Sequence, residues 1–200
     1  MKKIICYGDY NTYGFDARLF SGTDRLPEHI RWTGILSRSG EYKIVSAGKN
    51  GREIPHDRCE TEGFHTLLQL EAPFDLVTVM LGSNDLGMMS GCGMPEITAR
   101  MEAFLADALQ DPELCGHPEK LLLIAPTRTQ MSFLGPEEEK IDRISEEFAW
   151  AYRELTERFG VRFADAGSWD IDLCIDGLHF SPEGHAVFAE KIGNLLHQIL

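Results

Sequence analysis

Residues 4–14 read IICYGDYNTYG, an apolar run that passes directly into a turn. The apolar residues Ile4 to Tyr7 are typical of a short buried β-strand. Gly8 and Asp9 follow at once, and glycine and aspartate favour the tight turn at which such a strand ends. We therefore expect the chain to begin with a buried strand, and we expect its carboxyl end to present Tyr10 and its polar neighbours.

Apolar stretches of strand length alternate with longer amphipathic segments along the rest of the chain. Short buried strands are expected at Lys3–Tyr7, Tyr42–Ser46, Leu76–Leu81, Leu121–Ala125 and Val161–Ala164. Helices are expected at about Pro27–Ser39, Glu60–Leu70, Pro95–Gln110 and Pro136–Phe159, and from Ser181 or Pro182 to Leu200. This alternation predicts an α/β fold, a three-layer sandwich with a five-stranded parallel sheet covered on both faces. Residues 1–200 show no internal repeat or linker, so one domain is expected.

Composition and charge narrow the classes of partner. The chain of 200 residues carries 32 acidic and 19 basic residues, for a formal net charge of −13. Such a surface repels phosphate backbones, which disfavours nucleic acid and anionic membranes as partners. The N-terminus lacks the features of a signal peptide, and no apolar stretch approaches the roughly 20 residues of a membrane span. Five cysteines without a C-x-x-C spacing suit reduced thiols, and we expect a cytoplasmic protein.

Three further short polar segments, which we call blocks, lie next to the ends of expected strands or helices. Asn50-Gly51-Arg52 follows the second expected strand, Gly82-Ser83-Asn84-Asp85 follows the third, and Asp176-Gly177-Leu178-His179 precedes the last helix. Right-handed crossovers place the carboxyl ends of all strands on one rim of the sheet, where ligand sites form. We expect one cleft at this rim to be lined by Tyr10, Gly51, Asn84 and His179.

These four blocks, in this order, resemble those of the SGNH (GDSL-type) hydrolase superfamily. The resemblance spans the chain from Ile4 to the final helix. The local sequence around Tyr7-Gly8-Asp9 and over residues 81–86 is most similar to that of the small arylesterase/acylhydrolase branch. It implies a flavodoxin-like sandwich and a carboxylic-ester hydrolase that acts on small soluble esters without a cofactor.

The resemblance also implies roles for individual residues. His179 would be the general base, and Asp176 would orient it through a hydrogen bond to the far ring nitrogen. The oxyanion would be held by the backbone N–H groups of Tyr10 and Gly51 and by the side-chain amide of Asn84.

The chain departs from the family pattern at position 10, where a nucleophilic serine is expected and a tyrosine stands. A tyrosine hydroxyl reaches several ångströms further than that of serine, and the ring would fill part of the acyl pocket. One interpretation is an ester hydrolase whose activity is impaired or altered at Tyr10, including slow hydrolysis by a water that His179 activates. Another is an inactive protein that binds an ester or an acylated sugar. A third is that Tyr10 is itself the nucleophile.

Other residues carry weaker signals. A nucleotide- or flavin-binding module is disfavoured because no G-x-G-x-x-G or Walker lysine is present. The spacing of residues 56–59 matches no zinc pattern, so no metal is predicted. His185 is expected to pack at the start of the last helix. Arg52 either contacts substrate or makes a surface salt bridge. The run Gly87–Gly91 suits a contact between copies in a homo-oligomer, a substrate wall or a flexible surface loop.

Overall fold

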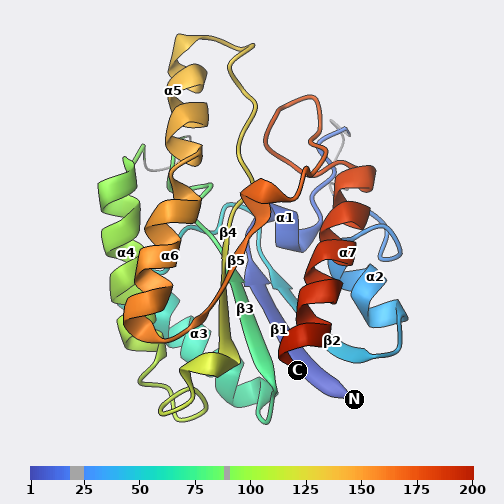
Figure 1. The fold of residues 1–200 in the computed structure, drawn as a ribbon, viewed down its shortest axis with the longest axis vertical. Helices are drawn as coiled ribbons and strands as arrows, with labels where there is room; N and C mark the ends of the chain where they lie inside the picture. Colours follow the sequence, from blue (N-terminus) through green and yellow to red (C-terminus); the bar gives the residue numbers. More distant parts are fainter. Residues whose placement is uncertain (19–24, 88–90) are drawn as a thin grey trace.

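A parallel sheet lies between two layers of helices in the computed structural model, which describes residues 1–18, 25–87 and 91–200 (Figure 1). The five strands of this part of the chain lie in the order β2-β1-β3-β4-β5, and all neighbours are parallel. Their bounds are β1 Lys2–Gly8, β2 Tyr42–Gly48, β3 Leu76–Met80, β4 Leu121–Ala125 and β5 Arg162–Asp165. The predicted three-layer α/β sandwich with its five-stranded parallel sheet is therefore confirmed.

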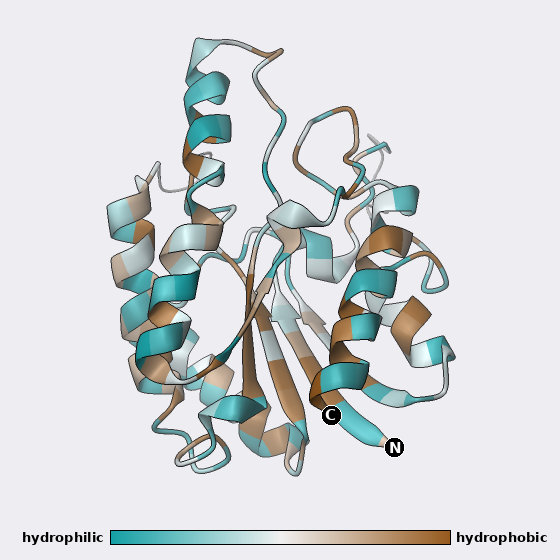
Figure 2. Ribbon diagram, viewed as in Figure 1, coloured by the Kyte–Doolittle hydropathy of each residue, from teal (hydrophilic) through white to brown (hydrophobic). Residues whose placement is uncertain are grey.

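Helices cover both faces of the sheet. One face packs against α3 (Arg58–Glu71), α4 (Met94–Ala108) and α6 (Phe148–Phe159). The other packs against α2 (Trp32–Arg38) and α7 (Pro182–Ile199). Figure 2 shows apolar strands enclosed by helices whose outer surfaces are largely hydrophilic. No helix of the described residues is long and apolar enough to cross a membrane.

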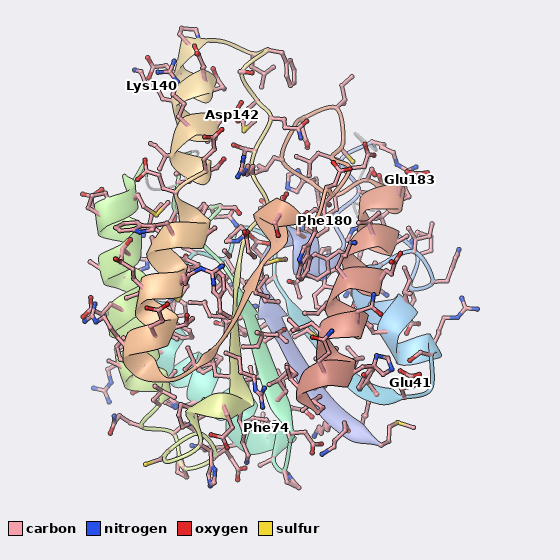
Figure 3. All side chains as sticks on the ribbon, in the orientation of Figure 1. Glu41, Phe74, Lys140, Asp142, Phe180 and Glu183 are labelled. Atoms are coloured by element: carbon pink, nitrogen blue, oxygen red, sulfur yellow. The ribbon has the colours of Figure 1, made fainter. Side chains whose placement is uncertain are left out.

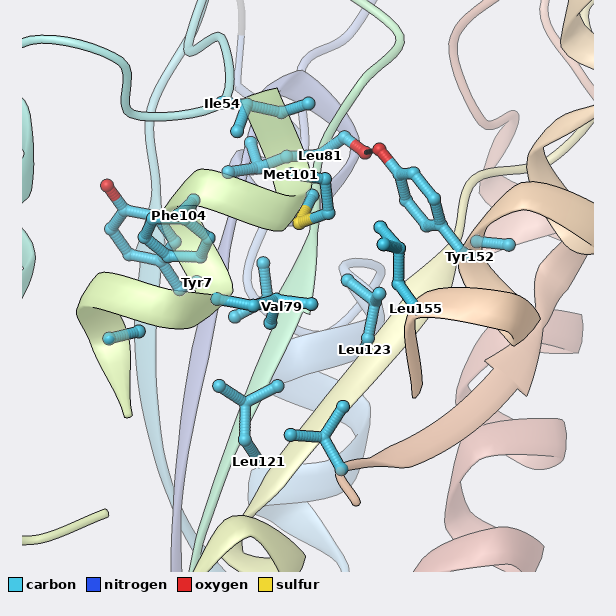
Figure 4. Close-up of a cluster of buried hydrophobic side chains, with 14 of the residues drawn as sticks. Tyr7, Ile54, Val79, Leu81, Met101, Phe104, Leu121, Leu123, Tyr152 and Leu155 are labelled. Atoms are coloured by element: carbon cyan, nitrogen blue, oxygen red, sulfur yellow. Dashed lines mark hydrogen bonds between the residues drawn. The ribbon is translucent and has the colours of Figure 1, made fainter. Parts of the chain in front are cut away.

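Strands β3 and β4 are buried along their whole length, because helices cover both of their faces. This explains why their sequences, LVTVM and LLLIA, do not alternate between apolar and polar residues. On the α6 side, the Tyr152 hydroxyl reaches into the core and donates to the Leu81 carbonyl at 2.9 Å (Figure 4). Pairing that hydroxyl removes the cost of burying it beside apolar side chains.

A short helix, α1 (Tyr10–Tyr13), lies on the carboxyl ends of β1 and β2. The sequence predicted only a turn here. The strand register places Gly8 beside Gly48, and α1 approaches both closely. A Cβ at Gly8 would lie 2.1 Å from Oγ1 of Thr12, and one at Gly48 would lie 2.1 Å from the backbone nitrogen of Tyr13. The two glycines therefore let α1 sit directly on the sheet.

Two predicted helices have different bounds in the structure. The helix expected over Pro136–Phe159 is two helices, α5 (Pro136–Ser145) and α6. Between them the backbone forms a 3₁₀-type turn, in which the backbone N–H of Glu147 donates to the carbonyl of Ile144 three residues back. The hydroxyl of Ser145 also donates to the carbonyl of Asp142. The helix expected over Pro27–Ser39 begins only at Trp32, because a turn closes at Pro27 first. Two short 3₁₀ helices, η1 (Pro118–Lys120) and η2 (Ala166–Ser168), complete the elements of the described residues.

Candidate active site

Asp176 and His179 form a hydrogen-bonded pair in the loop before α7. Nδ1–H of His179 donates to Oδ2 of Asp176 at 2.7 Å. The backbone N–H groups of Leu178 and His179 donate to Oδ1 of Asp176 at 3.0 and 3.1 Å. Burial raises the pKa of Asp176, but these hydrogen bonds outweigh it and hold the pKa below its usual range. Because Nδ1 donates, Nε2 of His179 is left as the accepting nitrogen.

Two aromatic rings pack against the His179 imidazole. Nε2 of His179 is buried and has no hydrogen-bond partner in the described part of the chain. The Tyr10 ring lies edge-on to the imidazole with 4.9 Å between centroids, and the Phe15 ring lies 4.8 Å from it. Tyr10 and Phe15 also pack against each other at 5.1 Å. Tyr10 thus meets His179 through its ring, and its hydroxyl makes no hydrogen bond to Nε2.

Asp9 and Asn84 meet where β1 and β3 end. Oδ1 of the buried Asp9 accepts from the backbone N–H of Asn11 at 3.1 Å, and Oδ2 accepts from Nδ2 of Asn84 at 3.3 Å. Burial raises the pKa of Asp9 to about 6, although the bond from Asn11 and the nearby His179 oppose the shift. Nδ2 of Asn84 also donates to the carbonyl of Arg52 at 3.1 Å. The Asn84 amide nitrogen therefore already has two protein acceptors.

A cavity of about 210 Å³ opens beside these groups. Its lining is mostly apolar with a few polar atoms, a combination typical of small-molecule sites. Tyr10, Asn84 and His179 line it, as the sequence predicts. The remaining lining residues are Phe15, Ser83, Gly87, Thr129, Met131, Ile141 and Leu178.

Gly51 lines a different cavity, of about 360 Å³, between the end of β2 and α3. Gly51 is therefore not among the residues that line the cavity of Tyr10, Asn84 and His179, and the common cleft expected from the sequence stays a prediction. Gly51 has a φ of +68° in a turn that closes where Arg52 N donates to the Lys49 carbonyl at 3.2 Å. This turn brings Gly51 to the side of α3. Its role as an oxyanion donor stays a prediction.

Comparison with known proteins identifies the family. A model of the GDSL-like lipase/acylhydrolase family matches residues 6–187. The chain belongs to the GDSL-like lipase/acylhydrolase family. The resemblance noted in the sequence is thus confirmed for both family and fold. No curated protein sequence matches the chain at a significant level.

Solved structures of esterases have the same fold as this GDSL-like chain. A carbohydrate acetylesterase from Sinorhizobium meliloti is 25% identical over the full length of both chains, with a TM-score of 0.83. An aryl esterase from M. smegmatis is 24% identical over the full length of both, also with a TM-score of 0.83. A lipolytic G-D-S-L protein from Veillonella parvula DSM 2008 is 15% identical, with a TM-score of 0.76 over 98% of this chain and 99% of its own.

Arg52 has a role in this GDSL-like chain that neither sequence interpretation named. Its guanidinium stacks on the Tyr7 ring with 4.0 Å to the centroid, and Nη1 donates to the carbonyls of Gly8, at 2.8 Å, and Ala47. Burial lowers the pKa of Arg52. The side chain joins the carboxyl ends of β1 and β2, while its own carbonyl holds Asn84.

Two further predictions from the sequence concern His185 and the run Gly87–Gly91. His185 is fully buried in α7, where Nδ1 accepts from the backbone N–H of Trp32 at 3.4 Å, so the packing role expected for it is confirmed. The contact between copies predicted for Gly87–Gly91 falls largely on residues 88–90, which lie outside the described residues. Phe15, Met131 and Ile141 line the cavity and were missed, because none belongs to a motif block.

Proposed function

We propose that this protein is a carboxylic-ester hydrolase for small soluble esters whose turnover is impaired by Tyr10. Family membership and the fold shared with aryl and carbohydrate esterases support the reaction class. One observation carries the impairment: Nε2 of His179 is buried and has no hydrogen-bond partner among the described residues, while the Tyr10 ring packs edge-on against the imidazole. A general base must reach the proton that it removes, and here no hydroxyl is bonded to it.

The geometry supports the acyl-transfer sequence for a serine at position 10. Its hydroxyl would attack the ester carbonyl and form a tetrahedral oxyanion, while Nε2 of His179 takes the hydroxyl proton. Asp176, bonded to Nδ1 at 2.7 Å, would stabilise the imidazolium that results. Collapse of the intermediate would release the alcohol with that proton. Water, activated by the same nitrogen, would then hydrolyse the acyl-enzyme and free the carboxylic acid.

Tyr10 obstructs this sequence at its first step. Its ring lines the ligand cavity, so it takes space that an acyl group would use. Its contact with His179 is between rings, and such a contact transfers no proton. The cavity has a volume of about 210 Å³ and a mostly apolar lining, which favours an ester with a short acyl or aryl group.

A second candidate function is binding of an ester or acylated sugar without turnover. The contacts of Asn84 favour it, because its amide nitrogen already donates to Asp9 and to the Arg52 carbonyl. A substrate oxyanion would have to displace one of these acceptors before the amide could stabilise it.

Hydrolysis of para-nitrophenyl acetate by wild type and Tyr10→Ser tests the proposal, together with labelling by a fluorophosphonate. We expect little turnover and no label in wild type, and both in Tyr10→Ser. Tyr13→Ser is a matched control, because Tyr13 lies on the same short helix and stacks with Arg25 away from the cavity. Brisk turnover by wild type that Tyr10→Phe abolishes would show that Tyr10 is the nucleophile. A folded Tyr10→Ser protein with no turnover would favour the binding function.

A further inference from the structure

One wall of the ligand cavity comes from segments outside all four motif blocks. Thr129 and Met131 lie in the loop after β4, and Ile141 lies on α5. Figure 1 shows α5 projecting beyond the carboxyl edge of the sheet, with this loop running beside it. We refer to Thr129–Ser132 together with Ile141 as the acyl wall. Loops of this kind tolerate variation in position unless side chains hold them, so the contacts of the wall decide its shape.

Asp142 holds the acyl wall. Its carboxylate accepts from the hydroxyl of Thr129 at 2.6 Å, from the backbone N–H of Met131 at 2.8 Å and from that of Ser132 at 2.8 Å. Figure 3 shows Asp142 on the side of α5 that faces the loop. The buried Ser145, one turn further along, adds a bond, because its hydroxyl accepts from the backbone N–H of Thr129 at 3.0 Å. Two side chains of α5 thus fix the loop.

The acyl wall also fits closely against the segments that carry His179 and Asn84. Between Thr129 and Met131, the backbone N–H of Gln130 donates to the Gly177 carbonyl at 2.7 Å. A Cβ at Gly177 would lie 2.1 Å from the Gln130 carbonyl oxygen, so only glycine permits this approach. On the other side, a Cβ at Gly87 would lie 2.6 Å from Cδ1 of Ile141. A shift of the wall therefore changes the distance across the cavity.

We propose that Asp142 is a positioning residue that holds the acyl wall and thereby determines the length of acyl group that the cavity accepts. The inference rests on the proposed function, because it assumes that the cavity receives the acyl part of an ester. Asp142 does not line the cavity, and it acts through Thr129, Met131 and Ser132. Releasing the wall widens the cavity, which removes contacts to a short acyl group and makes room for a longer one.

Ligand binding tests this without requiring turnover. Acetanilide and butyranilide are amide counterparts of phenyl acetate and phenyl butyrate, and their dissociation constants can be measured by calorimetry on the wild-type protein and its variants. We expect Asp142→Asn to shift the ratio of the two constants about tenfold in favour of butyranilide, because an amide cannot accept from all three donors. Ile141→Ala should shift the ratio in the same direction by opening the wall itself. Glu139→Gln is the matched control, an exposed acid of α5 that pairs with Arg143 of the same helix.

Amide hydrogen exchange supplies a second readout at Met131 and Ser132, which should exchange faster in Asp142→Asn than in Glu139→Gln. Where Asp142→Asn fails to fold, Ser145→Ala replaces it, because it releases Thr129 without touching the carboxylate or the cavity lining. A general loss of stability would weaken both anilides equally. An unchanged ratio in the folded variants therefore overturns the inference alone. Binding of neither anilide to wild type overturns the proposed ligand class, and the inference with it.

Discussion

The Tyr10 ring packs edge-on against the His179 imidazole, with 4.9 Å between the two centroids. Asp176 holds Nδ1 of His179 at 2.7 Å and leaves Nε2 as the acceptor, which is the arrangement that the proposed role of general base requires. Tyr10 therefore occupies the position beside the proposed base where the proposed function needs a hydroxyl. This relationship makes the chemistry of the site testable by restoring the hydroxyl at position 10 and then removing the other groups one at a time.

Turnover in Tyr10→Ser should depend on the Asp176–His179 pair. Adding His179→Ala should abolish it, and adding Asp176→Asn should lower kcat by about 10⁴, because the imidazole then loses its tautomer and its orientation. Initial rates with para-nitrophenyl acetate measure both effects. His185→Gln is a useful contrast, because that histidine is buried in α7 outside the cavity lining. Retention of turnover in the His179→Ala double variant would mean that another group acts as the base.

Asn84 should contribute to the transition state more than to ligand binding. In the Tyr10→Ser background, Asn84→Ala should lower kcat by about 10²–10³ with a small change in KM, as expected for an oxyanion donor. Ser83→Ala is the control, because Ser83 lines the same cavity. Steady-state kinetics with para-nitrophenyl acetate separate the two parameters. Equal losses in the two variants would assign Asn84 a structural role, through its bonds to Asp9 and the Arg52 carbonyl.

Much of this arrangement follows from the sequence for a physical reason. Parallel strands with right-handed crossovers must end on one rim, so blocks that follow strands converge whatever their separation along the chain. Tyr10, Asn84 and His179 meet in one cavity on that basis, and the spacing from Asp176 to His179 lets both side chains meet from one turn. These relationships depend on topology and on local geometry, and both can be predicted from the order and spacing of residues in the sequence.

The remaining features depend on contacts that no pattern records. Phe15 reaches His179 from a loop without periodicity, and the side chain of Arg52 turns inward to backbone carbonyls rather than outward to a carboxylate. Gly51 faces α3 because of the turn that it occupies. The break after Ser145 was missed because the flanking residues suit a helix, and only the bond from the Thr129 backbone shows what the serine holds.

Asp9 should make stability fall as pH rises through about 6. Its folded pKa is raised to about 6 by burial, above the usual value near 3.8, so the folded state favours the protonated acid. The stabilisation is fully present below the unfolded pKa and is lost as pH rises through the folded one. Relative to Asp9→Asn, wild type should lose on the order of 3 kcal/mol of unfolding free energy between pH 4 and pH 7.

Urea denaturation of both proteins across that range measures the effect of Asp9. Asp16→Asn is an informative contrast, because a hydrogen bond from Arg18 lowers the pKa of Asp16. Its contribution should therefore be present at neutral pH and fall as the solution becomes acidic, the opposite sign to that of Asp9. A stability difference between wild type and Asp9→Asn that does not change with pH would contradict the prediction.

His65 links α3 to the α4 region through two carboxylates. Its Nδ1 lies 2.9 Å from Oδ2 of Asp111, and its Nε2 lies 2.9 Å from Oδ2 of Asp107. Burial lowers the pKa of His65, but the hydrogen bonds to Asp111 and Asp107 outweigh it, so the pKa is raised. An imidazolium donates from both nitrogens and satisfies both carboxylates, whereas a neutral ring satisfies one.

This link should stabilise the protein at mildly acidic pH and weaken in alkali. Because the folded pKa of His65 is raised, its stabilisation is fully present below the unfolded value of about 6.5 and is lost as pH rises through the folded value. His65→Gln should therefore cost about 1 kcal/mol at pH 5.5 and less at pH 8.5, as measured by urea denaturation in 0.1 M salt. His117→Gln is the matched control, since its pair with Glu119 is exposed on both sides and should contribute little. A cost of His65→Gln that grows with pH would show that the neutral ring, rather than the imidazolium, holds the two aspartates together.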